Sequence, residues 1–189
     1  MQPTCNIAFK EWAAVCEALA AGRQTIILRK GGLREGREGF RVLHERFWLY
    51  PTNFHQQAED LTPAAADFIR RAKQTGASPG SVPIRLLAQV QTVYELSAEE
   101  AALRLAGEHI WSEATVKARF TYRRPGLFLL VVRIFTRPEP VIVAETRAMA
   151  GCKSWALLPA PISMDGLVPV LGDDEFGACV ARIERLLVS

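Results

Sequence analysis

Apolar residues recur at helical spacing in several parts of the chain. Residues 7–21 place apolar side chains three and four positions apart, which predicts an amphipathic helix. Thr62 and Pro63 are typical cap and first-turn residues of a second helix. Ser97 begins a capping-box sequence at the start of a third helix, and Asp173 suits the N-terminus of a fourth. The pattern therefore predicts about four helices.

Short apolar runs bounded by turn residues predict about six strands. The runs cover residues 24–30, 46–51, 84–96, 127–135, 141–145 and 153–159. Residues 116–123 also alternate strictly between apolar and polar side chains, which predicts a half-exposed strand with a basic outer face. Phe120 and Tyr122 are expected to face the core from this strand. The turn at Pro125 and Gly126 would bring the next run back antiparallel to it.

Together these elements predict an α+β fold with a mostly antiparallel sheet and about four flanking helices. Residues 76–83, GASPGSVP, are all small residues and prolines and are the best candidate for an internal linker. The part before this segment offers only two helices and two strands, which is too little to close its own core. A single domain over residues 1–189 is therefore expected.

The composition is that of a soluble globular protein, with 49% hydrophobic and 23% charged residues. The longest apolar runs, such as residues 127–132, fall far short of the roughly 20 residues of a membrane-spanning helix. The N-terminus has no basic region followed by an apolar core, as a secretory signal would have. We therefore expect a cytoplasmic protein without a membrane partner.

The cysteines and histidines show no metal-binding spacing. No CxxC, CxxH or HxxxH pattern occurs among Cys5, Cys16, Cys152, Cys179, His44, His55 and His109. We expect no metal site and no cofactor. Cys16 and Cys179 fall on apolar helical faces, where a small buried thiol is expected.

Basic residues concentrate in two segments, although the net charge is only +3. The first segment includes RKGGLREGREGF at residues 29–40, which lacks the spacing of a Walker phosphate loop. Its glycines and arginines suit either a phosphodiester backbone or a solvated connection. The second spans residues 117–137 and contains no acidic residue. A nucleic-acid-binding surface is predicted from Arg29, Lys30, Arg34, Arg37, Lys117, Arg119, Arg123 and Arg124.

Two other functions remain open on the sequence. A small enzyme acting on a nucleotide or modified base would use Cys152 as nucleophile with His55 and Glu145 nearby. A non-catalytic partner of another protein would instead scatter its basic residues over opposite faces. A restriction-type nuclease core needs an acidic residue two before a strand lysine, and Lys30, Lys117 and Lys153 all lack it. The chain is therefore not expected to be the cleaving domain of a nuclease.

Three segments resemble a bacterial family of unknown function, DUF1802. They read WAAVCEALAAGRQTIILRKGG at residues 12–32, RFWLYPTNFHQQ at residues 46–57 and GCKSW at residues 151–155. Members are reported alongside Mrr-type restriction nuclease domains, so the resemblance implies a link to DNA restriction and a nuclease partner. The favoured hypothesis is a nucleic-acid-binding module in that setting.

The stretch from Gly22 to Arg29 also resembles the motif of ASCH domains. These two residues match, whereas Gln24 and Ile27 stand where that motif has Lys and Glu. ASCH domains belong to the PUA-like group of small β-barrels that bind RNA or modified bases. The resemblance implies a PUA-like β-barrel for this chain.

Overall fold

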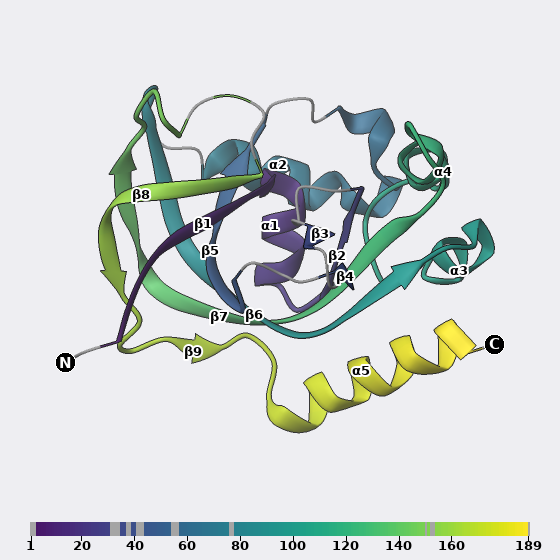
Figure 1. Cartoon of the computed structure of the whole chain (residues 1–189). Coiled ribbons are helices and arrows are strands. Elements are labelled where there is room, and N and C mark those ends of the chain that lie inside the picture. The colour runs from purple at the N-terminus through teal and green to yellow at the C-terminus, as the bar shows by residue number, and fades with distance from the viewer. Residues whose placement is uncertain are drawn as a thin grey trace.

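The structure is a computed structural model of the 189-residue chain. It describes all residues except 1–2, 31–34, 37–38, 41–43, 54–56, 76–77, 150, 152–153 and 189, and it describes residues 35–36 and 39–40 by their backbone alone. A strongly curved sheet wraps around α1 (Ala13–Ala20), with α2 (Ala66–Gln74) packed beside α1, and α5 (Asp173–Val188) lies on the outer side of the sheet (Figure 1). The predicted α+β class is confirmed.

Seven strands form the main sheet. Six of them follow one another in the order β2 (Ile26–Arg29), β7 (Leu127–Ala144), β6 (Ser81–Leu96), β5 (Arg46–Thr52), β1 (Thr4–Trp12) and β8 (Trp155–Ser163). The seventh, β9 (Val168–Pro169), pairs with β7, and β3 (Glu35–Gly36) and β4 (Gly39–Phe40) form a separate two-stranded sheet. Only β1 and β5 are parallel within the main sheet, so the expected antiparallel character is confirmed.

The main sheet is not closed into a barrel. Its strand order has two ends, β2 and β8, which do not pair with each other among the described residues. The expectation of a PUA-like β-barrel is therefore corrected to an open, curved sheet. Two register shifts between β6 and β7, at Ile84/Leu86 and Val90/Thr92, mark bulges that bend these long strands.

β6 and β7 form the longest antiparallel strand pair of the main sheet. β7 joins two runs that the sequence predicts as separate strands, residues 127–135 and 141–145. β6 begins at Ser81, so the last residues of the predicted linker lie in a strand. That strand pairs with β5 from before the linker and with β7 from after it. Residues 76–77 of the linker lie outside the described residues.

The described residues contain five α-helices and two short 3-10 helices. They are α1 (Ala13–Ala20), η1 (Ala58–Asp60), η2 (Pro63–Ala65), α2 (Ala66–Gln74), α3 (Glu99–Arg104), α4 (Glu113–Thr121) and α5 (Asp173–Val188). The helix predicted over residues 7–21 is wrong in its first half, where the chain forms β1. β1 lies between β5 and β8 in the sheet, and its residues Ala8 and Phe9 are buried. A strand buried on both faces carries neighbouring apolar residues, which also fit the spacing of a helix.

A second correction concerns residues 116–123, which form most of helix α4 and not a strand. The alternating pattern was misleading because Val116 and Phe120, four residues apart, also share one face of a helix, and both are buried. Residues 127–135 consequently pair with β6 and β2, not with a basic strand. The basic side chains of α4 do not lie on one pleated face.

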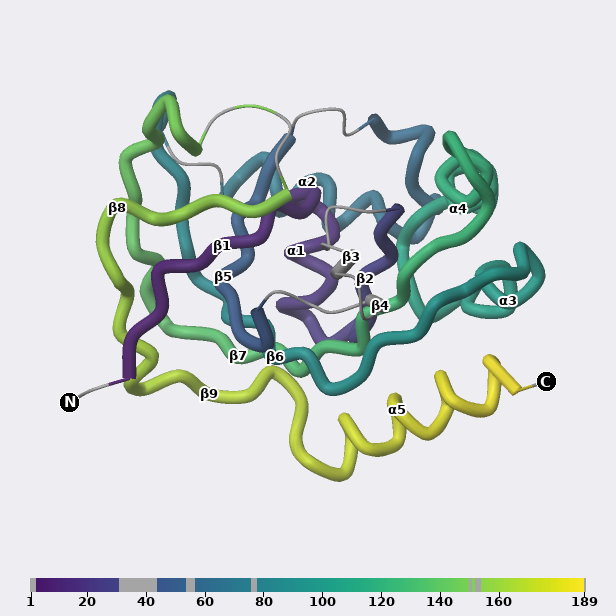
Figure 2. Tube along the Cα trace, in the orientation of Figure 1, coloured from purple at the N-terminus to yellow at the C-terminus, as the bar shows by residue number. Residues whose placement is uncertain are grey.

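The core fills the space between the sheet and α1. Figure 2 shows α1 within the curve of the sheet, where its residues Val15 and Leu19 are buried with Ile27 of β2. α5 lies on the outer side and contributes Phe176 and Ile183 to the same core. No helix in the described part of the chain is both long and apolar enough to cross a membrane.

Candidate nucleic-acid interface

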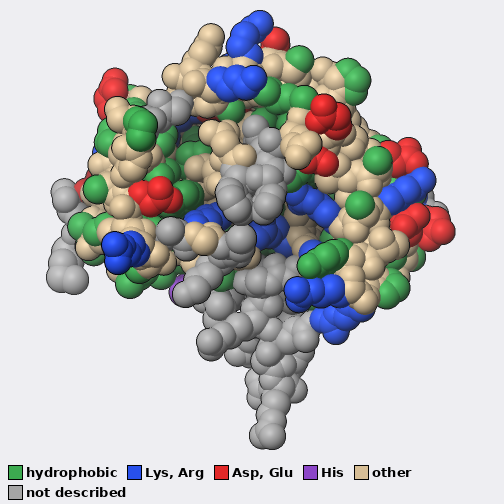
Figure 3. Space-filling model, turned by 90° about the horizontal axis from the view of Figure 1, so that it is seen from above, with side chains coloured by type: hydrophobic (Ala, Val, Ile, Leu, Met, Phe, Trp, Pro, Cys, Tyr) green, Lys and Arg blue, Asp and Glu red, His purple; other side chains and the backbone are tan. Residues whose placement is uncertain are grey.

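A cavity of about 260 Å³ lies where β1, β2 and α4 approach one another. Trp12 ends β1, Lys30 follows β2, and α4 contributes most of the remaining wall. The lining residues are Trp12, Lys30, Asp60, Thr115, Ala118, Arg119 and Tyr122. Seen from above, Lys and Arg side chains gather toward the middle and one side of the molecule (Figure 3).

Arg119 is the central cation of this cavity. Its guanidinium carbon lies 4.5 Å from the ring centroid of Trp12 and 5.3 Å from that of Trp111. Burial lowers the pKa of Arg119, and Glu11 partly opposes that shift. No hydrogen bond joins its guanidinium to another described residue. Two tryptophans therefore lie against a partly desolvated cation whose N–H donors have no hydrogen-bond partner among the described residues.

A buried ion pair holds Trp12 in place beside Arg119. Glu11 is 1% exposed, and its Oε1 accepts a 2.7 Å hydrogen bond from the backbone N–H of Trp12. Its Oε2 lies 3.5 Å from Nη1 of Arg29. Arg29 also donates a 2.7 Å hydrogen bond to Oγ of Ser154 and lies over the ring of Phe9. Arg29 is thus anchored on several sides and positions the cavity wall.

The other tryptophan is fixed by the segment between η1 and α4. Trp111 forms an isolated β-bridge with Leu61 and is 1% exposed. Oγ1 of Thr115 donates a 2.8 Å hydrogen bond to the carbonyl of Asp60. The side chain of Ser112 accepts a hydrogen bond from the backbone N–H of Thr115 and so caps α4. These contacts place Arg119 against Trp111.

Lys30 has a different role from Arg119 in the same cavity. Its Nζ donates to the carbonyls of Phe120 at 2.7 Å and Gly126 at 2.8 Å, and to that of Arg124. Burial lowers the pKa of Lys30, and Arg124 adds to this effect. Because an ammonium has three donors, this arrangement uses all of them to hold the connection between α4 and β7.

The rim of the cavity carries an exposed aromatic ring and two arginines. Tyr122 follows the end of α4 and is 56% exposed, so the expectation that it faces the core is wrong. Phe120 is buried as predicted. Arg123 has a positive φ of 63° and places its guanidinium 5.1 Å from the ring centroid of Tyr122. Arg124 comes next along the chain, with its N–H donating to the carbonyl of Tyr122.

The eight predicted basic residues do not form one continuous set. Lys30, Arg119, Arg123 and Arg124 lie in or beside the cavity, and Arg29 supports its wall. Lys117 is exposed on α4 and pairs with Glu113 at 2.6 Å. Arg34 and Arg37 lie outside the described residues. Trp12 and Trp111 carry no sequence signal of a binding site beyond their chemistry, which is a large ring able to stack on arginine.

Of the three residues predicted for the alternative enzyme site, the structure describes only Glu145. Glu145 is exposed and accepts a hydrogen bond from the hydroxyl of Tyr50. Burial and this bond raise the pKa of Tyr50. Nearby, Nζ of Lys10 lies 5.2 Å from the ring centroid of Tyr50 and donates to the carbonyl of Gly151. Cys152 and His55 lie outside the described residues, so their pairing stays a prediction.

The described thiols differ in their burial. Cys16 is buried as predicted, whereas Cys179 is only half-buried. The part of the chain that the structure describes contains no cluster of three His, Cys, Asp or Glu side chains able to hold a metal ion.

The family of the chain follows from a match that spans most of its length. A family model described as a domain of unknown function, DUF1802, matches residues 8–182. The chain belongs to the DUF1802 family. It matches no curated protein.

Solved structures with a similar course of the chain include an ASCH protein from Zymomonas mobilis. That crystal structure is 12% identical to this DUF1802 chain, with 93% of each chain covered and a TM-score of 0.46. A serine-to-alanine variant of the same Zymomonas mobilis protein is 13% identical, covers 93% of this chain and 94% of its own, and has a TM-score of 0.45. A tyrosine-to-phenylalanine variant gives 12% identity, 93% and 96% coverage and a TM-score of 0.46.

Proposed function

We propose that this DUF1802 chain is a nucleic-acid-binding module that holds a backbone phosphate of a single strand against Arg119. The observation that carries the proposal is the guanidinium of Arg119, stacked between Trp12 and Trp111 and without a hydrogen-bond partner among the described residues. A buried cation is costly unless it is paired and hydrogen-bonded. A phosphate supplies hydrogen-bond acceptors that no described residue gives Arg119, and it adds to the negative charge of Glu11 and Asp60.

The geometry of the stack favours a phosphate as the ligand. The guanidinium carbon lies over both rings, and the planar, forked N–H donors of an arginine can bind two phosphate oxygens. Glu11 is compensated by Arg29, so it does not compete for Arg119 at hydrogen-bond distance. Burial lowers the pKa of Arg119, and the negative charge of Asp60, which also lines the cavity, partly opposes that shift.

The size of the cavity favours one unit of a longer chain over a free small molecule. Its volume of about 260 Å³ lies below the roughly 300–1,000 Å³ of small-molecule sites. The exposed ring of Tyr122 and the guanidinium of Arg123 adjoin the opening. A base stacked on an aromatic side chain contributes about 1–3 kcal/mol to single-strand binding. We infer that a neighbouring base stacks on Tyr122 while the phosphate reaches Arg119.

The proposal is tested by fluorescence anisotropy with labelled single- and double-stranded DNA and RNA at low and moderate salt. The wild-type chain should bind a single strand in the micromolar range, with affinity that falls as salt rises. Arg119→Gln should weaken binding at least tenfold, or about 1.4 kcal/mol, because the stacked cation is lost. Tyr122→Ala should weaken it to a similar degree.

The matched control is Arg70→Gln on α2. Arg70 is exposed and pairs with Asp67, so the substitution removes the same charge away from the cavity. Its affinity should equal that of the wild type. If Arg119→Gln folds normally and binds as tightly as Arg70→Gln, Arg119 does not contact the ligand and the proposal is wrong. The restriction partner implied by the sequence resemblance stays a prediction.

A further inference from the structure

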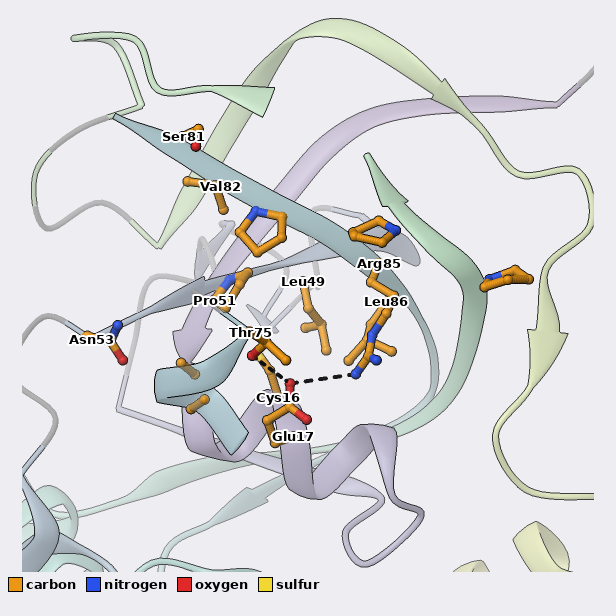
Figure 4. A pocket seen from close by; sticks show the side chains of 15 residues that line it. Cys16, Glu17, Leu49, Pro51, Asn53, Thr75, Ser81, Val82, Arg85 and Leu86 are labelled. Atoms are coloured by element: carbon orange, nitrogen blue, oxygen red, sulfur yellow. Dashed lines mark hydrogen bonds and ion pairs between the residues drawn. The ribbon is translucent and has the colours of Figure 1, made fainter. Parts of the chain in front are cut away.

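A second, larger cavity opens between α1, α2, β5, β6 and β7. Its volume is about 340 Å³, within the range of small-molecule sites, and it is separate from the Arg119 cavity in its lining residues. Most of its wall is apolar, including Leu49, Leu86 and four prolines at positions 51, 83, 138 and 140. Figure 4 shows Leu49, Pro51 and Leu86 among the side chains that line this cavity. Nothing in the proposed function uses this cavity.

The polar part of this cavity is a carboxylate beside a guanidinium. Oε1 of Glu17 lies 3.6 Å from Nη2 of Arg85 and accepts a 3.3 Å hydrogen bond from Oγ1 of Thr75 (Figure 4). The ion-pair distance exceeds that of a hydrogen bond. Arg85 makes no hydrogen bond to another described residue, and its side chain is 34% exposed, against 13% for Glu17. A donor group and an acceptor group therefore lie side by side on the wall.

The paired charges decide which ligand this wall accepts. A carboxylate ligand would face Arg85 but also Glu17, and an ammonium ligand would face Glu17 but also Arg85. Each would meet one like charge in a partly desolvated space. An uncharged carboxamide avoids both conflicts, because its carbonyl accepts from Arg85 while its N–H donates to Glu17. The apolar remainder of the ligand would lie against Leu49, Leu86 and the prolines.

We propose that this cavity binds an uncharged small molecule in which a carboxamide is attached to an apolar body. Binding is non-covalent. Cys16 lines the cavity, but burial raises the pKa of its thiol and Glu11 and Glu17 raise it further, so the thiolate needed for attack is suppressed.

Three probes that share one ring separate the possible ligand charges. Benzamide, benzoate and benzylamine are titrated at pH 7 into the full chain, and binding is followed by ligand-observed NMR. Benzamide should bind in the millimolar range expected for a fragment of its size, and the two charged probes at least tenfold more weakly. Equal binding of all three probes, or no binding of any, would overturn the proposal.

Two single substitutions should change which of the three probes binds best. Glu17→Gln leaves Arg85 unopposed, so benzoate should become the best of the three probes. Arg85→Gln leaves Glu17 unopposed, so benzylamine should become the best. A ranking that stays the same in both variants contradicts a role for the pair, even where both variants fold normally.

A blocking variant locates the binding to this cavity. Thr75 is exposed at the end of α2 and lines the cavity, so Thr75→Trp should abolish benzamide binding. Lys73→Trp adds the same ring at an exposed position of α2 that does not line the cavity, and it should bind benzamide as the wild type does. If Thr75→Trp folds and still binds benzamide, the probe lies elsewhere. Nucleic-acid binding by these variants is measured separately, since this inference does not depend on it.

Discussion

A buried histidine lies beside Trp111, the ring that Arg119 contacts. His109 is 4% exposed, and its ring centroid lies 5.4 Å from that of Trp111. Neither of its ring nitrogens has a hydrogen-bond partner among the described residues. Burial lowers the pKa of His109 to about 4. The imidazole is therefore neutral in the folded chain at neutral pH.

This burial makes stability depend on pH. The folded-state pKa of about 4 lies below the ordinary value of roughly 6.5, so the unfolded chain binds more protons between these pH values. The contribution of His109 is fully present above about pH 6.5 and declines as the pH falls toward 4, by up to about 3 kcal/mol. The measurement is the free energy of unfolding in urea, at steps from pH 7 to pH 4.

The comparison variant for this prediction is His109→Leu. Carboxylates titrate in both chains, so only the difference between wild type and variant reports on the histidine. The wild type should lose more stability on acidification than His109→Leu. Parallel curves would show that the pKa of His109 is not depressed by folding.

At the scale of the element, α4 shows why the sequence pattern predicts the wrong arrangement for part of the interface. Lys117 and Arg119 are two positions apart, which places them on the same side of a strand but on different sides of a helix. The alternating pattern fitted both structures over this short span. The cap at Ser112 and the helical spacing of Val116 and Phe120 are compatible with the helix that forms. The cluster around Arg119 also depends on Trp12 and Trp111, which come from distant positions in the sequence.

The cap of α4 leads to a prediction about stability. Ser112→Ala removes the hydrogen bond from the backbone N–H of Thr115 and should lower the free energy of unfolding by about 1 kcal/mol. It should also weaken single-strand binding, because α4 carries Arg119. Urea denaturation and anisotropy measure the two effects.

Ser97→Ala is the matched control for that substitution. The sequence places Ser97 in a capping box, but the structure has Ala98 at the N-cap of α3 and no side-chain cap there. Its removal should change stability by less than about 0.5 kcal/mol. A loss as large as that of Ser112→Ala would mean that α3 is capped by Ser97 after all.

At the scale of the whole molecule, the sequence predicts the types of most elements but not the order in which the strands pair, nor that the sheet stays open. The α+β class, the antiparallel sheet and the strands over residues 24–30, 46–51 and 84–96 followed from apolar runs with clear turn residues at their ends. The open sheet and the position of β1 between β5 and β8 depend on pairings between distant residues. Local periodicity does not contain that information, because the apolar spacing of residues 7–12 also fits a helix.

Residues that are adjacent in the chain line the two cavities. Trp12 lines the Arg119 cavity, and Ala13, Cys16 and Glu17 line the larger one. The end of β1 therefore lines one cavity, and the first turns of α1 line the other. Because Glu17 lies in this segment, Glu17→Gln should also be checked for unchanged single-strand binding at the Arg119 cavity.

The position of β1 has a consequence for the kinetics of folding. Thr4 pairs with Ser163, whereas the nearest pair between β6 and β7 joins Leu96 to Leu127. Closing the longer loop costs more chain entropy, so the pairing of β6 with β7 should precede that of β1 with β8. Phe9→Leu should then accelerate unfolding and leave the folding rate nearly unchanged, whereas Leu129→Ala should slow folding.

Stopped-flow measurements in urea separate these two rates. A folding rate that falls for Phe9→Leu as much as for Leu129→Ala would show that β1 already pairs in the transition state. Otherwise the N-terminal strand joins the sheet last and leaves it first. The lifetime of the folded chain is then determined at β1, the strand that also carries one wall of the proposed interface.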